Sequence, residues 1–210
     1  MENSAKKIAN YLLQIKAIKL QPSNPFTWAS GWKSPIYCDN RKTLSFPEVR
    51  SYIRDSFALI VKENYPEAEL IAGVATGAIA HGALTAEKLG LPFIYVRSEA
   101  KGHGLGNQIE GYYEKGQKVV VIEDLISTGG SSLNAVRALR EAGCEVLGMI
   151  AIFTYGFKKA EEGFTTEKCT LSTLSNYNTL VETAVESGYI GQTEVETLKK
   201  WRVDPSVWGI

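Results

Sequence analysis

Short apolar runs alternate with amphipathic stretches along the middle of the chain. From residue 70 onward, the runs LIAGVA, FIYVR, KVVVI and CEVLGMIAIF are separated by helical patterns or by a long polar interval. Apolar runs without alternation are typical of strands buried on both faces of a parallel sheet. The repeated order of strand and helix therefore predicts an α/β fold. Its central, mostly parallel sheet should be flanked by helices and should bind ligands at the carboxyl ends of its strands.

The segments on either side of this core, which we place at residues 47–157, have different patterns. An amphipathic helix capped by Ser4 is expected at the N-terminus. Residues 20–46 contain prolines among aromatic residues, which predicts turns and short hairpin strands, so that residues 1–46 form a small cap, or hood. Residues 158–210 show two polar helical patterns, which predict peripheral helices. Because there is no repeat or linker, the 210 residues are expected to form a single domain.

The composition argues against several kinds of partner. Lys and Arg together number 23, as do Asp and Glu, so the chain lacks the global positive charge that drives non-specific nucleic-acid binding. No segment has the pattern of a signal peptide or a membrane span. Three widely spaced cysteines provide neither a disulfide framework nor a zinc motif. We therefore expect a cytoplasmic protein with reduced thiols that binds neither nucleic acid nor membrane.

The stretch VVVIEDLISTGGSS, Val119 to Ser132, contains the main candidate site. The strand is expected to end at Glu123 and Asp124, and the following loop leads directly into a helix. Backbone N–H groups, hydroxyls and a helix N-terminus are the parts of a phosphate site, and paired glycines let an anion approach closely. Carboxylates repel phosphate but accept hydrogen bonds from hydroxyls, so this combination fits a ribose 5-phosphate. Two other interpretations stay open from the residues alone: an ordinary turn with Asp124 as a helix cap, and a magnesium-binding phosphoacceptor site.

A long polar interval, residues 98–117, separates FIYVR from KVVVI. It is rich in glycine and poor in apolar residues, which predicts a mobile flap. Lys101 and His103 within it, and Arg97 at its base, offer the positive charge and the proton donor that a departing diphosphate needs. The alternative is a solvated hairpin whose charged residues have no role. His81, in a helical pattern, is expected to be structural or exposed.

Three motifs resemble known sequences and follow one another in the same order. VVVIEDLISTGGSS is similar to the phosphoribosyl diphosphate (PRPP) signature of the type I phosphoribosyltransferases. RSEAKGHG, which starts at Arg97, resembles the catalytic loop of the orotate phosphoribosyltransferases. FTWASGWKSPIYCDNR, which starts at Phe26, is similar to the start of that family's orotate pocket. One such motif is weak evidence, whereas three in the family's order, over about residues 19–157, are specific.

The chain departs from the pattern of that family at three positions. Ser98 and Thr76 stand where some members have lysine. Tyr155 follows the strand ending in IAIF, where some members use an arginine for the orotate carboxylate. We therefore carry over no role for Ser98 or Thr76, and the carboxylate contact stays unassigned.

The resemblance implies transfer of the 5-phosphoribosyl group from PRPP to orotate, giving orotidine 5′-phosphate and diphosphate, a step of pyrimidine synthesis. It also implies Mg²⁺ as cofactor, bound mainly through PRPP with no protein ligand assigned, and a homodimer in which each flap reaches the partner's site. Lys101, His103 and Arg97 would be catalytic and would contact PRPP, while Phe26 and Ser127 would contact orotate. The other PRPP contacts would be Glu123, Asp124, Leu125, Ile126, Ser127, Thr128, Gly129, Gly130 and Ser131.

Two rival functions share the implied fold. A phosphoribosyltransferase for another nucleobase would differ in the base pocket, and residues 26–41 together with the flap favour orotate. A non-catalytic PRPP-sensing regulator should add a nucleic-acid-binding module and a basic face, and the sequence indicates neither.

Overall fold

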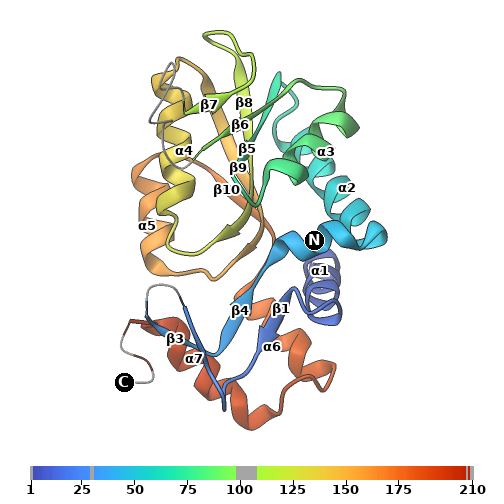
Figure 1. The fold of residues 1–210 in the computed structure, drawn as a ribbon, viewed down its shortest axis with the longest axis vertical. Coiled ribbons are helices and arrows are strands. Elements are labelled where there is room, and N and C mark those ends of the chain that lie inside the picture. Colours follow the sequence, from blue (N-terminus) through green and yellow to red (C-terminus); the bar gives the residue numbers. More distant parts are fainter. Residues whose placement is uncertain (1, 29–30, 98–107, 207, 209–210) are drawn as a thin grey trace.

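A computed structural model describes residues 2–28, 31–97, 108–206 and 208, and its centre is a six-stranded sheet (Figure 1). The strand order is β10-β9-β8-β5-β6-β7, with β7 antiparallel to β6 and all other neighbours parallel. The expected mostly parallel sheet is therefore confirmed. The strands are β5 (Leu70–Val74), β6 (Phe93–Val96), β7 (Ile109–Glu110), β8 (Lys118–Ile126), β9 (Glu145–Thr154) and β10 (Leu171–Asn176).

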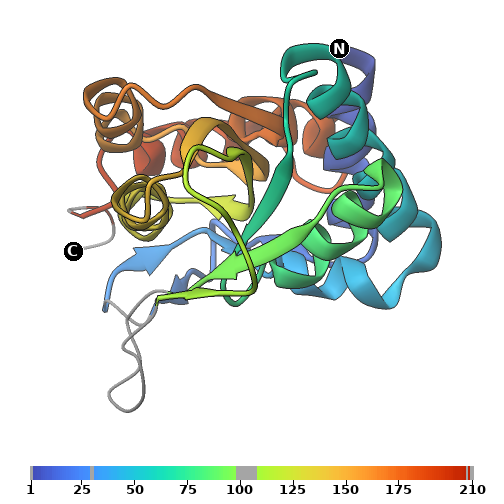
Figure 2. The same cartoon turned by 90° about the horizontal axis from the view of Figure 1, so that it is seen from above.

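The central strands carry apolar runs such as residues 119–122 because both faces of the sheet are covered (Figure 2). In β8, Val119 and Val121 belong to one buried cluster, whereas Val120 and Ile122 belong to the other, as the two-residue period of a strand requires. The first cluster includes residues of α4 (Gly130–Glu141) and α5 (Lys158–Thr166). The second includes residues of α1 (Glu2–Gln14), α2 (Pro47–Asn64) and α3 (Ile79–Leu89).

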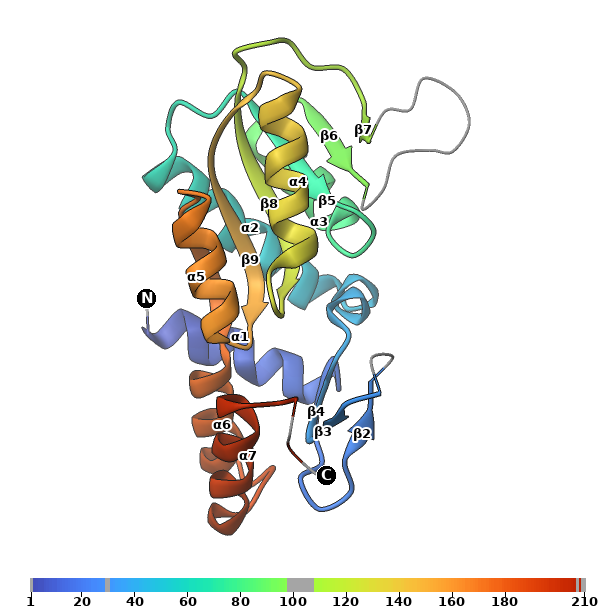
Figure 3. The ribbon, with the colours of Figure 1, turned by 90° about the vertical axis from the view of Figure 1, so that its left-hand side faces the viewer.

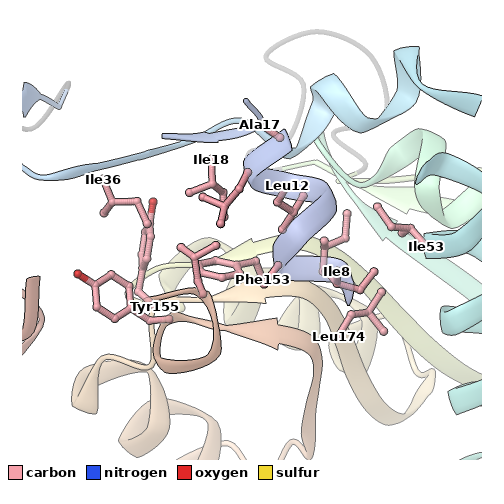
Figure 4. Close-up of a cluster of buried hydrophobic side chains, with 14 of the residues drawn as sticks. Ile8, Leu12, Ala17, Ile18, Ile36, Ile53, Phe153, Tyr155 and Leu174 are labelled. Carbon is pink, nitrogen blue, oxygen red and sulfur yellow. The ribbon is translucent and has the colours of Figure 1, made fainter. Parts of the chain in front are cut away.

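The N-terminal cap is made of short antiparallel strand pairs, as expected. Strand β1 (Ile18–Leu20) pairs with β4 (Ile36–Cys38), and β2 (Phe26–Thr27) pairs with β3 (Lys33–Ser34). A 3-10 helix, η1 (Asn40–Ser45), then leads from the cap to α2. Ile8 and Leu12 of α1 join Ile18 of β1 and Phe153 of β9 in one buried cluster, which fixes the cap on the sheet (Figure 4).

Ser4 does not cap the first helix, because α1 already begins at Glu2. The Ser4 hydroxyl instead lies 3.2 Å from the Tyr52 hydroxyl of α2. The serine therefore joins two helices, and the helix start was predicted three residues too late.

The segment after residue 158, expected to be peripheral, instead completes the core. It supplies strand β10, and helices α6 (Tyr177–Glu186) and α7 (Val195–Val203) lie next to α1 and the cap strands (Figure 3). Trp201 of α7 is fully buried and packs against the rings of Trp28, Tyr155, Phe157 and Tyr177. The polar pattern misled because only one narrow stripe of each helix carries apolar residues, and a narrow stripe suffices for burial on one side. Within the described ranges, no helix is long and apolar enough to cross a membrane.

Candidate active site at the carboxyl end of β8

Strand β8 continues past the two acidic residues, to Ile126, instead of ending at Glu123 and Asp124 as expected. The parallel ladder with β9 extends just as far, with Glu123 opposite Ala151 and Ile126 opposite Thr154. Neighbouring side chains on a strand point to opposite faces. The two carboxylates therefore have different surroundings, which the sequence alone does not show.

Glu123 is directed toward helix α4 and is only 4 % exposed. Its carboxylate accepts hydrogen bonds from the Ser132 hydroxyl at 2.8 Å and from the backbone N–H of Asp124 at 2.9 Å. Burial, together with the neighbouring Asp124 carboxylate, raises the pKa of Glu123 well above its usual range. Glu123 is therefore a buried residue beneath the site.

Asp124 lies on the opposite face, beside the turn that follows β5, and is only partly buried. A Cβ atom added at Gly77 would lie 2.3 Å from Oδ2 of Asp124, so the glycine leaves the space that this carboxylate occupies. The backbone carbonyl of Asp124 accepts a hydrogen bond from the Asn40 amide at 2.6 Å. Asp124 is thus the more accessible of the two carboxylates, and its backbone is fixed by the cap.

The loop Ser127–Thr128–Gly129 joins β8 to α4 and presents the start of that helix. Gly129 is the N-cap residue, and in the described part of the chain no side chain caps the helix there. Its φ of +81° lies in the left-handed region, which glycine adopts without strain. A Cβ atom at Gly130 would meet no atom within 4 Å, so this position faces open space. Uncapped backbone N–H groups beside open space form a site for an anion.

The other members of the predicted PRPP contacts divide into exposed and buried positions. Ser127 and Thr128 are partly buried and Ser131 is exposed, so none of the three is enclosed in the core. Leu125 is partly buried, whereas Ile126 is fully buried in the cluster under α4 and α5. The Ile126 carbonyl accepts a hydrogen bond from the Tyr155 N–H at 3.1 Å. Ile126 therefore has a structural role in addition to any backbone contact with a ligand.

The turn after β5 lies at the same edge of the sheet. The peptide bond between Ala75 and Thr76 is cis. The Ala75 N–H donates to the Val96 carbonyl at 2.8 Å, and the Ala78 N–H donates to the Val74 carbonyl at 3.0 Å. These bonds hold the turn, including Thr76, beside the ends of β5 and β6.

Arg97 follows β6 at this edge, and its guanidinium lies 3.6 Å from a carboxylate oxygen of Glu110. The residues expected to complete the flap chemistry, Lys101 and His103, lie outside the described residues, as does Ser98. The described end of the interval differs from the expected flap. Ile109 and Glu110 form strand β7, which pairs with β6, and Ile109 is buried.

The residues predicted near the base are aromatic and come from the cap and from the end of β9. Phe26 is partly buried, with its ring 5.6 Å from that of Tyr37. Tyr155 is only 2 % exposed and stacks on Trp28 at 5.6 Å, and burial raises the pKa of its hydroxyl well above the usual range. The side chain of Tyr155, expected from the resemblance to stand where some members use an arginine, is therefore part of the core.

His81 is buried in α3, which confirms the expectation that it is structural or exposed. Burial lowers its pKa to about 4, so the ring is neutral near pH 7. Its Nε2 atom lies 3.1 Å from the hydroxyl of Thr43.

Comparison with known proteins places this geometry in a class. Residues 47–187 match the family model of the phosphoribosyl transferase domain, so fold and site together define a phosphoribosyltransferase. Over 210 residues, 100 % of both chains, the protein is 58 % identical to the orotate phosphoribosyltransferase of Porphyromonas gingivalis. The chain belongs to the orotate phosphoribosyltransferase family.

Solved structures of similar proteins show the same fold. The orotate phosphoribosyltransferase of Aeropyrum pernix matches with a TM-score of 0.75 at 29 % identity, over 88 % of this chain and 99 % of that chain. The enzyme of Mycobacterium tuberculosis, solved in complex with PRPP, matches with a TM-score of 0.65 at 21 % identity, over 84 % of this chain and 98 % of that one. The type I phosphoribosyltransferase fold expected from the three motifs is thereby confirmed.

Proposed function

We propose that the protein transfers the 5-phosphoribosyl group from PRPP to orotate, giving orotidine 5′-phosphate and diphosphate in pyrimidine biosynthesis. The observation that carries this proposal is the uncapped start of α4 at Gly129 and Gly130, which follows the partly buried Asp124 of β8 within one short loop. Backbone donors suit a phosphate, and a carboxylate suits hydroxyls. A ribose 5-phosphate carries a phosphate for the backbone donors and hydroxyls for the carboxylate.

The loop after β8 is assigned to the ribose and its 5′-phosphate. The phosphate accepts hydrogen bonds from the N–H groups of the loop and of the start of α4, with the hydroxyls of Ser127, Thr128 and Ser131 around it. Asp124 accepts from a ribose hydroxyl, and Glu123 supports it from the α4 side, where Ser132 already holds its carboxylate. Leu125 and Ile126 contribute backbone groups to this wall of the site.

Mg²⁺ is proposed as the cofactor, bound mainly through the oxygens of PRPP. Within the described ranges no group of three or more His, Cys, Asp or Glu side chains could hold a metal ion. Magnesium commonly binds through one or two carboxylates together with substrate phosphates, and Asp124 provides a carboxylate at this edge of the sheet. When bound, the ion supplies positive charge against the diphosphate.

Arg97, Lys101 and His103 are proposed to act on the departing diphosphate. As the bond to C1 breaks, positive charge spreads over C1 and the ring oxygen, while negative charge grows on the diphosphate. Arg97 and Lys101 stabilise that negative charge, and His103 donates a proton to it. Arg97 stands at the carboxyl end of β6, the edge that the β8 loop shares, which supports its part of this assignment.

Orotate is proposed to bind between the cap and the β8 loop, against Phe26 and Ser127. The carboxylate of orotate does not bind through Tyr155, whose side chain is buried among Trp28, Phe157 and Trp201. Backbone groups, the Ser127 hydroxyl or groups of the cap are proposed to hold that carboxylate instead.

A homodimer with shared sites is proposed as well. If each flap serves the neighbouring site, mixing Lys101→Ala with Asp124→Asn subunits restores activity in the mixed dimers, because one of the two sites then has both residues intact. No recovery after subunit exchange, shown by native mass spectrometry to have occurred, would contradict the shared site.

The three cysteines are free, which supports a reducing, cytoplasmic location.

The function is tested by the ultraviolet absorbance of orotate in the presence of PRPP and Mg²⁺. Loss of the signal, with a matching release of diphosphate, is expected. Turnover of adenine, guanine or uracil in place of orotate would support the rival transferase. Tight PRPP binding without turnover of any base would support the regulator.

A further inference from the structure

A chain of buried polar side chains connects the cap, the end of β8 and helix α3. Asn40, Thr43 and His81 are 1 %, 0 % and 1 % exposed, respectively. Asn40 and Thr43 lie on η1, and His81 lies on α3. Buried polar groups of this kind cost stability unless they are hydrogen bonded, so their partners are informative.

The hydrogen bonds run in one direction along this chain. The Nδ2 group of Asn40 donates to the backbone carbonyl of Asp124 at 2.6 Å, and the Thr43 hydroxyl donates to the backbone carbonyl of Asn40 at 2.6 Å. Because the single hydroxyl proton of Thr43 is used in that bond, its oxygen must accept from Nε2–H of His81 at 3.1 Å. His81 and Thr43 therefore hold the main chain of Asn40, and the Asn40 side chain in turn holds the backbone carbonyl of Asp124.

Asn40 is suited to this place by both ends of its amide. Its Oδ1 atom accepts from the Cys38 thiol at 3.4 Å, while Nδ2 points to the Asp124 carbonyl. An apolar residue would leave that carbonyl without this donor, and an aspartate would place two oxygens face to face. The same residue, Asp124, is thus held at its backbone carbonyl by Asn40, while its carboxylate lies against Gly77.

We propose that Asn40 is a positioning residue that fixes Asp124 for binding the ribose of PRPP, with Thr43 and His81 orienting Asn40. This inference rests on the proposed function only for the identity of the sugar ligand. Asn40 lies on the cap side, outside the loop of residues 123–131. The contact between the cap and β8 and the shape of the ribose site are thereby linked through one side chain.

The test measures ribose 5-phosphate binding by calorimetry and the KM for PRPP and for orotate, at a temperature where thermal melts show every variant folded. Asn40→Asp at pH 8 keeps the shape but removes the donor, and Asn10→Asp makes the same change at an exposed position of α1. Thr43→Val removes the hydroxyl, and Thr43→Ser restores it. Thr183→Val removes a buried hydroxyl in α6, whose bond to the Thr179 carbonyl is 2.7 Å long, as a control for lost stability alone.

We expect Asn40→Asp to weaken ribose 5-phosphate binding and to raise the KM for PRPP about tenfold, and Thr43→Val about threefold, as the loss of a buried hydrogen bond predicts. The KM for orotate should change by less than about twofold, and Thr43→Ser, Asn10→Asp and Thr183→Val should bind as the unchanged protein does. The inference would be overturned if the ribose 5-phosphate affinity and the KM for PRPP of Asn40→Asp were both within about twofold of those of the unchanged protein. If Asn40→Asp does not fold, equal ribose 5-phosphate binding by Thr43→Val and Thr43→Ser overturns it instead. Binding constants decide even if orotate is not turned over, so a failure of the proposed function remains distinguishable.

Discussion

The neighbouring strands β8 and β9 end at the same edge of the sheet, yet their ends are built in opposite ways. After β8 come hydroxyls, two glycines and a helix start that no described side chain caps. After β9 come Tyr155 and Phe157, which are closed over by Trp28 and Trp201. The β8 end leaves backbone donors open to a ligand, whereas the β9 end buries aromatic rings to hold the cap and α7 on the core.

This difference shows that position at the carboxyl edge of a parallel sheet is not sufficient for a ligand contact. The edge collects candidates, but the local side chains decide between binding and packing. The resemblance led us to expect Tyr155 where some members of the family use an arginine, and its side chain is buried in the core. The comparison therefore predicts stability effects at the β9 end and binding effects at the β8 end.

The largest effect is expected for Trp201→Ala, which empties the centre of the aromatic cluster. A fully buried tryptophan replaced by alanine lowers the free energy of unfolding by about 3–5 kcal/mol. Urea unfolding measures this loss. Trp201→Phe should cost less, because within the described ranges the buried Nε1 atom has no hydrogen-bond partner to lose. A changed KM for PRPP in the folded Trp201→Phe variant would contradict the claim that the end of β9 affects stability and not ligand binding.

The next largest effect is a loss of stability at low pH that depends on His81. Burial lowers the pKa of His81 to about 4 in the folded protein, below the value of 6.5 that is usual for a histidine. The unfolded chain therefore takes up this proton first as the pH falls, and the folded state loses stability between about pH 6.5 and 4. The difference amounts to about 3 kcal/mol at most. His81→Gln should remove this part of the pH dependence, as measured by urea unfolding at several pH values; equal pH slopes for both proteins would contradict the assignment.

A smaller effect, on binding alone, is expected for Asp124→Asn. Loss of a charged acceptor for a hydroxyl costs about 1.5–3 kcal/mol, which corresponds to a decrease of about 10- to 100-fold in kcat/KM for PRPP. Steady-state kinetics measures it, with stability changed little because the side chain is only partly buried. Asp55→Asn, an exposed carboxylate on α2 paired with Arg54 and Lys88, is the matched control and should leave kcat/KM unchanged.

The smallest effects separate the two glycines of the loop. Gly129→Ala forces a side chain into a left-handed conformation and within 3.3 Å of the Phe164 ring, at a cost of about 1–2 kcal/mol in stability. Gly130→Ala meets no neighbour, so stability should hold while the added methyl group fills the anion site and weakens ribose 5-phosphate binding. Thermal melts and calorimetry distinguish the two. The reverse pattern would show that Gly130, not Gly129, determines the turn.

The sheet, the cap and the β8 loop could be predicted because their signals are local: unbroken apolar runs, prolines among aromatics, and acids followed by glycines. Strand β10 was missed because its sequence, LSTLSN, is rich in serine, threonine and asparagine and shows no apolar run. Its burial depends on pairing with the rest of the sheet. Strand β7 was missed because its two residues owe their structure to β6. The roles of α7 and Asn40 depend on contacts between segments far apart in the sequence.

Within the site, the sequence predicted the residue types but not their orientation. Glu123 and Asp124 are adjacent and chemically alike, yet one is bonded to Ser132 and the other lies against Gly77. The two-residue period would have separated them if the strand had been extended to Ile126. The strand end was placed too early because acidic residues usually interrupt an apolar strand.

The most direct test of the central claim, that residues 123–131 hold the ribosyl group and its phosphate, is a crystal structure of this protein with PRPP. The 5′-phosphate should lie against the backbone of Ser127 to Ser131, with a ribose hydroxyl about 2.5–3.0 Å from a carboxylate oxygen of Asp124. Density for the sugar at another part of the molecule, with the β8 loop empty, would contradict it.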